Sequence, residues 1–383
     1  MKKLKNIFIN IGLIFLSLGF CFVVLESGFR LAGYEAIYEV YSKPSLFWRY
    51  DPLLGWSHEP NSEDTYIGPR PWPVEFSTKI KINSLGLRNP EITEKPKDGI
   101  RILFTGDSRV AALEVKYEQT FVALLEKLLT KELGIPVQAI NAGVRGYGTD
   151  QSYLYYKERG YKLKPDFVVH LHTGNDPLNN ITLHRMRRPF GKPVFRPNAD
   201  GKLELTGYPT PHYKLCSEYE LDDNFEVVRL DSPFRTAVCN LQIQATDHSA
   251  LFTYVILKLT QHRELLWKFY LAGSPKGIMI PDDGSQARYQ LTTQLLRQFA
   301  KTVKENDIKF VFMSDGDHQL ANLDREALKK DQVSLIEIDS LVKEGEKLNG
   351  FILFQNDGHW TPLGHQRLAA FLVPKLVDII KSK

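Results

Sequence analysis

The stretch Arg101-Ile-Leu-Phe-Thr-Gly-Asp-Ser-Arg109 decides the fold of this 383-residue chain. Its apolar part, residues 102–105, predicts a buried strand, which Gly106 and Asp107 break immediately before Ser108. A serine at the carboxyl end of a parallel strand lies where open α/β sheets bind their ligands. The first amides of the segment that follows have no partner within a helix and can face a negative charge. The stretch predicts a ligand site, although Gly-Asp-Ser alone also fits a plain turn with a helix cap.

The composition indicates an ordinary globular protein. The chain is 43% hydrophobic and 25% charged, and its net charge is +4. Its length favours one large domain with additions. The positive charge follows no stripe and accompanies no binding motif, which argues against a nucleic-acid partner. No CxxC or Cys/His zinc spacing appears, and the preferred interpretation needs neither a metal nor another cofactor. The oligomeric state is left open.

An apolar run near the N-terminus predicts a membrane anchor. Residues 7–25 carry no charge, and three lysines precede them. As a helix this run would span roughly 28 Å, close to the thickness of a hydrocarbon core. Because lysines stay in the cytoplasm, the chain after Leu25 should be extracytoplasmic. A cleaved signal peptide is the alternative, although no small-residue cleavage site follows the run. In an extracytoplasmic domain Cys216 and Cys239 can form a disulfide, but the preferred interpretation is that they are two unpaired buried cysteines.

Three segments follow from these patterns. We predict an anchor over residues 1–30, a β-rich lead-in over residues 31–98, and a main domain over residues 99–383. Within that domain, residues 177–280 show no clear period and read as a long insertion, a lid or a substrate wall over the strand ends.

The main domain alternates strands with helices, which predicts a three-layer, doubly wound α/β fold with a parallel sheet. Gly143-Val-Arg-Gly-Tyr-Gly148 has its glycines in the wrong order for a dinucleotide fingerprint. The predicted strands are 102–105, 137–141, 167–171, 309–313 and 334–338, and the predicted helices are 118–132, 149–159, 285–306 and 362–381.

Four short blocks lie on loops after predicted strands. They are Gly106-Asp-Ser108, Gly143, Gly174-Asn-Asp176 and Asp357-Gly-His359. In this order they resemble the SGNH (GDSL-like) hydrolases, and the match looks closest to membrane-anchored envelope members, some of which acetylate or deacetylate exopolysaccharides. The resemblance implies a flavodoxin-like sheet and an ester-cleaving serine enzyme. It does not cover the insertion, and Arg109 stands where an apolar residue is more usual.

The chemistry of the same residues supports an acyl-transfer site. Serine is a poor nucleophile until a base takes its proton, so His359 is expected to activate Ser108. Asp357 can accept from the other imidazole nitrogen and fix the tautomer. The amides of Ser108 and Gly143 and the side chain of Asn175 are expected to form an oxyanion hole. The predicted function is an extracytoplasmic serine esterase acting on an acylated small molecule, glycan or lipid.

Other interpretations stay open. One alternative is an enzyme that transfers an acyl group to a cell-envelope glycan instead of to water, and another is an inactive binding protein of the same fold. Asp317-His318 is a second Asp/His pair on a strand-end loop. Residues of types that bind zinc also occur close together in the third strand and after it, and they permit a metal-dependent hydrolase: His170, His172, Asp176 and His184. Asp107 and His365 are expected to be structural.

Overall fold

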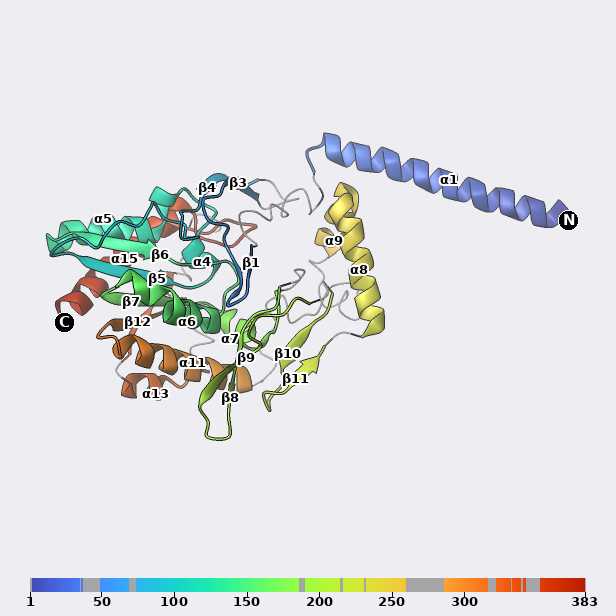
Figure 1. Ribbon diagram of the computed structural model, residues 1–383. Coiled ribbons are helices and arrows are strands. Elements are labelled where there is room, and N and C mark those ends of the chain that lie inside the picture. Colours follow the sequence, from blue (N-terminus) through green and yellow to red (C-terminus); the bar gives the residue numbers. More distant parts are fainter. Residues whose placement is uncertain are drawn as a thin grey trace. The chain divides into compact units, whose positions relative to one another are not determined.

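The computed structural model describes two compact units (Figure 1). One comprises residues 1–43, 69–74 and 233–273, and the other comprises residues 44–68, 75–232 and 274–383. The residues described are 2–34, 36, 49–68, 74–185, 190–213, 216–230, 232–259, 286–315, 322–331, 333–338, 340–341 and 352–382. Each unit is considered by itself below.

A five-stranded parallel sheet forms the centre of the larger unit. Its order is β13-β12-β7-β5-β6, so the strands in chain order lie 2-1-3-4-5. This order confirms the predicted doubly wound, flavodoxin-like sheet, in which ligands bind where the order reverses beside the first strand. The strands are β5 (Ile100–Thr105), β6 (Val137–Asn141), β7 (Phe167–His172), β12 (Lys309–Ser314) and β13 (Ser334–Glu337).

Helices cover both faces of the sheet because consecutive strand residues point to opposite sides. Leu103 and Val168 pack with one group of helices, whereas Ile102 and Val169 pack with the other. The first group is α6 (Thr149–Glu158), α7 (Asp176–Ile181) and α11 (Gln286–Lys304), and the second is α5 (Phe121–Leu133) and α15 (Pro362–Lys381). Shorter helices are α4 (Ser108–Ala111) and α13 (Arg325–Lys330), with 3-10 turns at Tyr117–Gln119 and Gly160–Leu163. The structure therefore has the three layers that the sequence predicts.

Two antiparallel hairpins precede the first core strand. They pair β1 (Arg49–Asp51) with β2 (Gly55–Ser57), and β3 (Glu63–Gly68) with β4 (Phe76–Lys81). Trp56 of β2 donates its indole N–H to the Arg145 carbonyl, and the Tyr147 hydroxyl donates to the Trp56 carbonyl. These bonds tie the β1–β2 hairpin to the loop after β6.

The predicted insertion, residues 177–280, divides between the two units. Its first part carries two hairpins of the larger unit, formed by β8 (Val194–Pro197) with β9 (Leu203–Thr206) and β10 (Tyr219–Leu221) with β11 (Val227–Arg229). Its later part carries α8 (Pro233–His248) and α9 (Ala250–Leu259), which belong to the unit of the N-terminal helix. Because 233–273 group with that helix, the insertion is not one continuous wall of the larger unit.

The N-terminal helix α1 (Lys2–Leu31) contains one stretch, Asn6–Leu31, that is long and apolar enough to cross a membrane by length and composition. Its mean hydropathy is 2.6. Near its end, the Glu26 carboxylate accepts hydrogen bonds from Ser249 Oγ and from the first amides of α9, those of Ala250 and Leu251. One carboxylate thereby caps the start of α9, whose first amides have no partner within that helix.

The cysteines differ from the preferred sequence interpretation. Cys21 is a free cysteine on α1, whereas Cys216 and Cys239 are disulfide-bonded. The interpretation of two unpaired buried thiols is therefore wrong. Sequence spacing cannot decide such a case, because a disulfide depends on how the fold places two distant residues.

Candidate functional site

The first strand of the core delivers Ser108 to the edge of the sheet. The side chain of Asp107 caps α4, where its Oδ1 accepts from the Arg109 amide at 3.0 Å. The predicted capping role of Asp107 is thus confirmed. Ser108 is the first residue of α4, so its amide has no acceptor within that helix.

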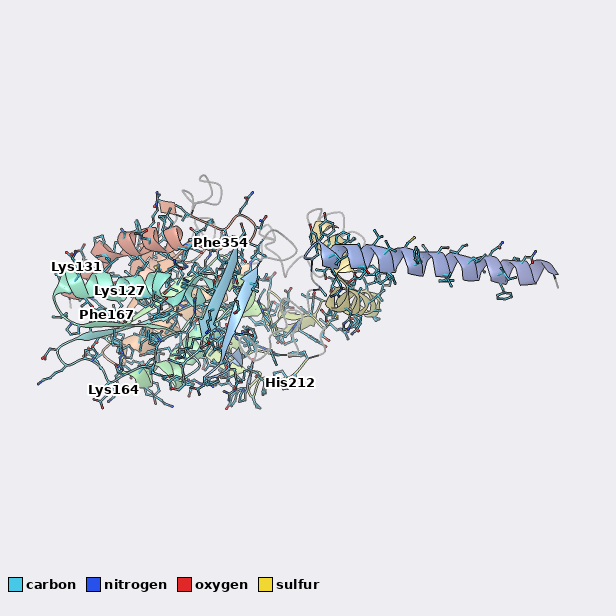
Figure 2. All side chains as sticks on the ribbon, turned by 90° about the horizontal axis from the view of Figure 1, so that it is seen from above. Lys127, Lys131, Lys164, Phe167, His212 and Phe354 are labelled. Atoms are coloured by element: carbon cyan, nitrogen blue, oxygen red, sulfur yellow. The ribbon has the colours of Figure 1, made fainter. Side chains whose placement is uncertain are left out.

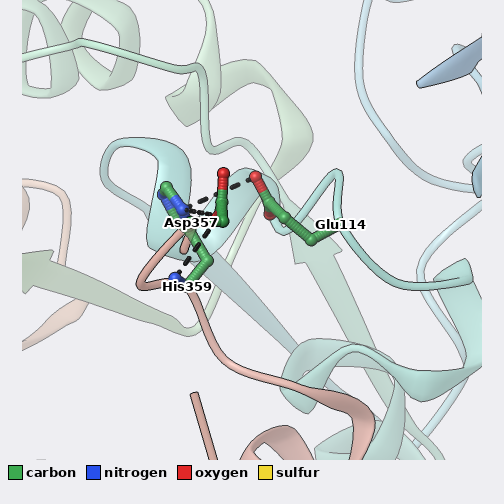
Figure 3. A group of neighbouring side chains, drawn as sticks. All are labelled: Glu114, Asp357 and His359. Carbon is green, nitrogen blue, oxygen red and sulfur yellow. Dashed lines mark hydrogen bonds and ion pairs between the residues drawn. The ribbon is translucent and has the colours of Figure 1, made fainter. Parts of the chain in front are cut away.

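His359 lies beside Ser108, with its Nε2 2.8 Å from the serine Oγ. The other ring nitrogen, Nδ1, is hydrogen-bonded to Asp357 Oδ1 (Figure 3). Both residues stand on a tight loop in which Gly358 has φ +80° and the Phe354 amide donates to the His359 carbonyl at 2.8 Å. Glycine suits this turn because other residues rarely adopt a positive φ. The structure thus brings together three residues that are spread over more than 240 positions.

The β3–β4 hairpin holds the loop of Asp357. The carboxylate of Glu75, just before β4, accepts from the amides of Gln355, Asn356 and Asp357 at 2.8–3.2 Å. Phe354, labelled in Figure 2, packs edge-on against Phe76, with 5.2 Å between ring centroids. A charged acceptor for three successive amides fixes a segment that no helix or strand supports.

The predicted oxyanion donors lie close to the nucleophile segment, but not all of them are free. A Cβ on Gly143 would lie 2.4 Å from the Ala111 amide nitrogen, so only glycine fits this contact with α4. The Gly143 amide donates to Asn141 Oδ1 at 3.0 Å, so it must share its proton to serve an oxyanion. Asn175 Nδ2 donates one hydrogen to Asp107 Oδ2 at 3.2 Å, and within the described residues its second hydrogen is left for a ligand.

Electrostatics favour an ionised Asp357. Burial raises the pKa of Asp357, but the hydrogen bond from His359 and the charges of His359 and Arg145 outweigh it and hold the pKa below its ordinary value. Arg145 is ion-paired to Glu114, whose Oε1 is 3.7 Å from His359 Nδ1. Sequence reasoning missed Glu114, Arg145 and Glu75, because nothing in their local sequence indicates contact with a loop more than 200 residues away.

The residues of the metal-site alternative are engaged in hydrogen bonds. His172 Nδ1 is 3.1 Å from Asp176 Oδ2, and His170 Nδ1 is 3.2 Å from Thr105 Oγ1. Burial, followed by the charge of His172, lowers the pKa of His170 to about 3. His184 is bonded instead to the amide of Tyr219, at 3.3 Å. Among the described residues, the side chains that come close enough together to share a metal ion are different ones. They are Glu114, Asp357 and His359, whose potential ligand atoms lie within 4.8 Å of one another.

Two further histidines were weighed from the sequence. His365 is buried on α15, where its Nδ1 accepts from the Phe121 amide at 3.2 Å, which confirms the expected structural role. Asp317-His318 lies outside the described residues.

The arrangement as a whole has the SGNH block order on a doubly wound sheet. This chain resembles the SGNH hydrolases. No protein-family profile matches it, and no curated protein does. Solved structures with some likeness include an α/β hydrolase, LAE5, from the metagenome of Lake Arreo in Spain (12% identity, TM-score 0.37, covering 71% of this chain and 93% of that one). Two others are Axe2, an acetylxylan esterase from Geobacillus stearothermophilus (12%, 0.36, 71% and 92%), and TesA (16%, 0.35, 72% and 97%). TM-scores this low support no conclusion, so the proposal below rests on the geometry of the site.

Proposed function

We propose that this protein is a serine esterase that hydrolyses acyl esters through an acyl-enzyme. The observation that carries the proposal is the chain of contacts from Ser108 Oγ to His359 Nε2, at 2.8 Å, and from His359 Nδ1 to Asp357. It supplies a nucleophile, a base within hydrogen-bond reach, and an acid that orients the base.

Acylation follows from this geometry. Ser108 Oγ attacks the ester carbonyl carbon while His359 Nε2 takes the hydroxyl proton. The carbonyl oxygen becomes an oxyanion, which the Ser108 amide and Asn175 Nδ2 stabilise, together with the Gly143 amide where it is shared. The bond to the leaving alcohol oxygen then breaks, and His359 Nε2 returns the proton to that oxygen. Asp357 stabilises the imidazolium in between without itself taking the proton.

Deacylation reverses the roles. A water gives a proton to His359 Nε2 and attacks the acyl carbon, and the acid is released as Ser108 regains its proton. If a glycan hydroxyl attacks the acyl carbon in place of water, the acyl group passes to the glycan and the protein is an O-acyltransferase. O-acetyl and longer acyl esters of small molecules, glycans or lipids all fit this mechanism, and an inactive binding protein would need no such contacts.

The test uses the full-length chain and a short-chain aryl ester. Ser108→Ala and His359→Ala should each remove nearly all hydrolysis, and the double variant should be little worse, because such losses are not additive within one catalytic unit. A serine-directed phosphonate should label Ser108, and EDTA should leave the rate unchanged. Wild-type activity in Ser108→Ala, or its loss with EDTA, would support the metal alternative at His170 and His172. If the protein transfers acetyl to a sugar without hydrolysing esters, the proposed catalytic residues stand and the acyl acceptor is a sugar hydroxyl instead of water.

A further inference from the structure

A second carboxylate lies beside the proposed catalytic histidine. Glu114 Oε1 is 3.7 Å from His359 Nδ1, the same nitrogen that is bonded to Asp357 (Figure 3). The side chain is fully buried, and its Oε2 has no hydrogen-bond partner within the described part of the chain. A buried carboxylate oxygen without a hydrogen-bond partner lowers the stability of the fold. Its position close to His359 therefore suggests a role at that histidine.

Glu114 is held rigidly in this place. It follows α4 by three residues, so it belongs to the segment of the nucleophile, whereas Asp357 belongs to the loop of His359. The Arg88 guanidinium, itself buried, donates to the carbonyls of Ala111, Ala112 and Val115. Thr78 of β4 donates its hydroxyl to the Glu114 carbonyl at 2.8 Å. Two elements of the lead-in thereby fix the backbone that carries the second carboxylate.

Arg145 places an opposite charge beside Glu114. It is ion-paired to Glu114 Oε1, and its guanidinium lies over the Tyr66 ring, 5.3 Å from the centroid. Burial lowers the pKa of Arg145, but the interactions with Tyr66, Glu114 and Asp357 outweigh it and keep the pKa above its ordinary value. Arg145 pairs with Glu114 Oε1 and Asp357 is bonded to His359 Nδ1, so both carboxylates already have partners without a bound metal ion.

We propose that Glu114 is a second positioning carboxylate for His359, able to take over the Nδ1 proton when Asp357 is absent. This inference rests on the proposed function. At 3.7 Å, Glu114 does not bond Nδ1 while Asp357 does, so it acts through its charge; loss of the Asp357 side chain leaves Glu114 as the nearest acceptor. The charged and titratable groups around His359 are Ser108, Glu114, Arg145, Asp357 and His365, with Tyr66 beneath Arg145 and Arg109 over Trp360.

The first experiment compares kcat in two backgrounds. Loss of a triad acid that has no substitute costs about 10⁴-fold. Asp357→Ala should lose only about 10- to 100-fold, and adding Glu114→Gln should bring the loss to about 10⁴-fold. Glu118→Gln, an exposed residue four positions later, is the matched control and should add nothing. The proposal is wrong if Asp357→Ala alone lowers kcat about 10⁴-fold and the addition of Glu114→Gln lowers it no further.

The second readout is the pH profile of kcat/KM in the Asp357 background. Glu114→Gln removes a negative charge beside the imidazolium and leaves Arg145, so the acid limb should move to lower pH. A merely structural Glu114 would lower kcat without moving this limb. If Glu114→Gln fails to fold because Arg145 loses its partner, Glu114→Gln/Arg145→Gln replaces the ion pair by two amides and is combined with Asp357→Ala instead, again with an expected loss of about 10⁴-fold.

A third measurement is independent of esterase activity. In histidine-labelled protein, NMR should show that His359 keeps its Nδ1–H tautomer in Asp357→Ala and loses it when Glu114→Gln is added. If hydrolysis does not depend on Ser108 but the tautomer behaves in this way, the proposed function fails and the positioning role stands. If hydrolysis depends on Ser108 and the tautomer is lost in Asp357→Ala alone, the positioning role fails by itself.

Discussion

At the scale of single residues, the site is built from side chains that each have more than one task. Asp107 caps α4 and also accepts from Asn175 Nδ2, so the same carboxylate orients the nucleophile segment and a proposed oxyanion donor. Asn141 likewise accepts from the Gly143 amide and donates to the Val110 carbonyl at 2.7 Å. Preorganised donors of this kind stabilise charge without reorganising during the reaction. Removing one donor should therefore affect the transition state more than substrate binding.

Asn175→Ala tests this expectation. Because its free hydrogen would meet the oxyanion and not the ground-state ester, kcat should fall about 10²- to 10³-fold with little change in KM. Steady-state kinetics on an aryl ester measure both constants. Asn179→Ala, in the helix α7 that Asn175 precedes, is the control and should leave kcat within about twofold. A rise in KM with unchanged kcat would assign Asn175 to substrate binding instead.

At the scale of elements, the β3–β4 hairpin supports the site from outside the sheet. Through Glu75 it holds the Asp357 loop, and through Thr78 and Tyr66 it reaches Glu114 and Arg145. None of these contacts follows from a local pattern. The lead-in is thus part of the machinery that we propose, in addition to connecting the first helix with the core.

Glu75→Ala should loosen the loop without touching the reacting atoms. Three amides lose a charged acceptor, so we expect kcat to fall about 10-fold and the free energy of unfolding to fall by about 1–2 kcal/mol. Kinetics and urea unfolding measure the two effects. Glu63→Ala removes the exposed ion pair with Lys79 on the same hairpin and should change neither, since exposed pairs contribute little. Equal effects of the two variants would contradict a specific role of Glu75.

The contact between α15 and α5 gives a pH-dependent stability. Burial, followed by the charges of Arg88 and Arg109, lowers the pKa of His365 to about 3. In the unfolded chain this histidine has its ordinary pKa of 6.5, so the unfolded chain binds the proton first, and stability is lost as the pH falls from 6.5 towards 3. Between pH 7.5 and 5 this residue should account for about 2 kcal/mol.

His365→Gln should flatten that dependence. Glutamine keeps an acceptor for the Phe121 amide but takes up no proton, so the variant should lose less stability between pH 7.5 and 5 than the wild type does. Urea unfolding at both pH values gives the difference. His212→Gln is the control, because His212 is exposed (Figure 2) and its replacement should leave the slope unchanged. An unchanged slope in His365→Gln would contradict the assignment.

At the scale of the whole molecule, the predictable features are those that repeat locally. Apolar strands with glycine-containing ends gave the sheet, and its parallel topology brings strand ends together, which is why Ser108 could be expected near His359. Glu114 and Glu75 could not, because their partners are set by how the lead-in packs. The division of the insertion could not be predicted from the sequence either. Residues 233–259 follow the hairpins in the sequence, but α9 is capped by Glu26 of α1 and belongs to the unit of that helix.

The last prediction concerns the membrane. We propose that α1 is a retained anchor and that the catalytic domain is extracytoplasmic. The apolar stretch Asn6–Leu31 and the disulfide-bonded Cys216 and Cys239 support this, since disulfides persist in oxidising compartments. A reporter that is active only outside the cytoplasm, fused after residue 60, should be active.

Four further observations decide the same prediction. Alkaline carbonate should not extract the protein from membranes. The mass of the intact protein should correspond to a chain that begins at Met1 or Lys2. Thiol labelling of the exported protein should modify Cys216 and Cys239 only after reduction. Replacing the lysines at positions 2, 3 and 5 by glutamate should lower reporter activity, because positive charges on the cytoplasmic side set the orientation. A reporter active only in the cytoplasm would contradict the topology, whereas a mass lacking the first 25–30 residues would convert the anchor into a cleaved signal peptide and leave the extracytoplasmic placement intact.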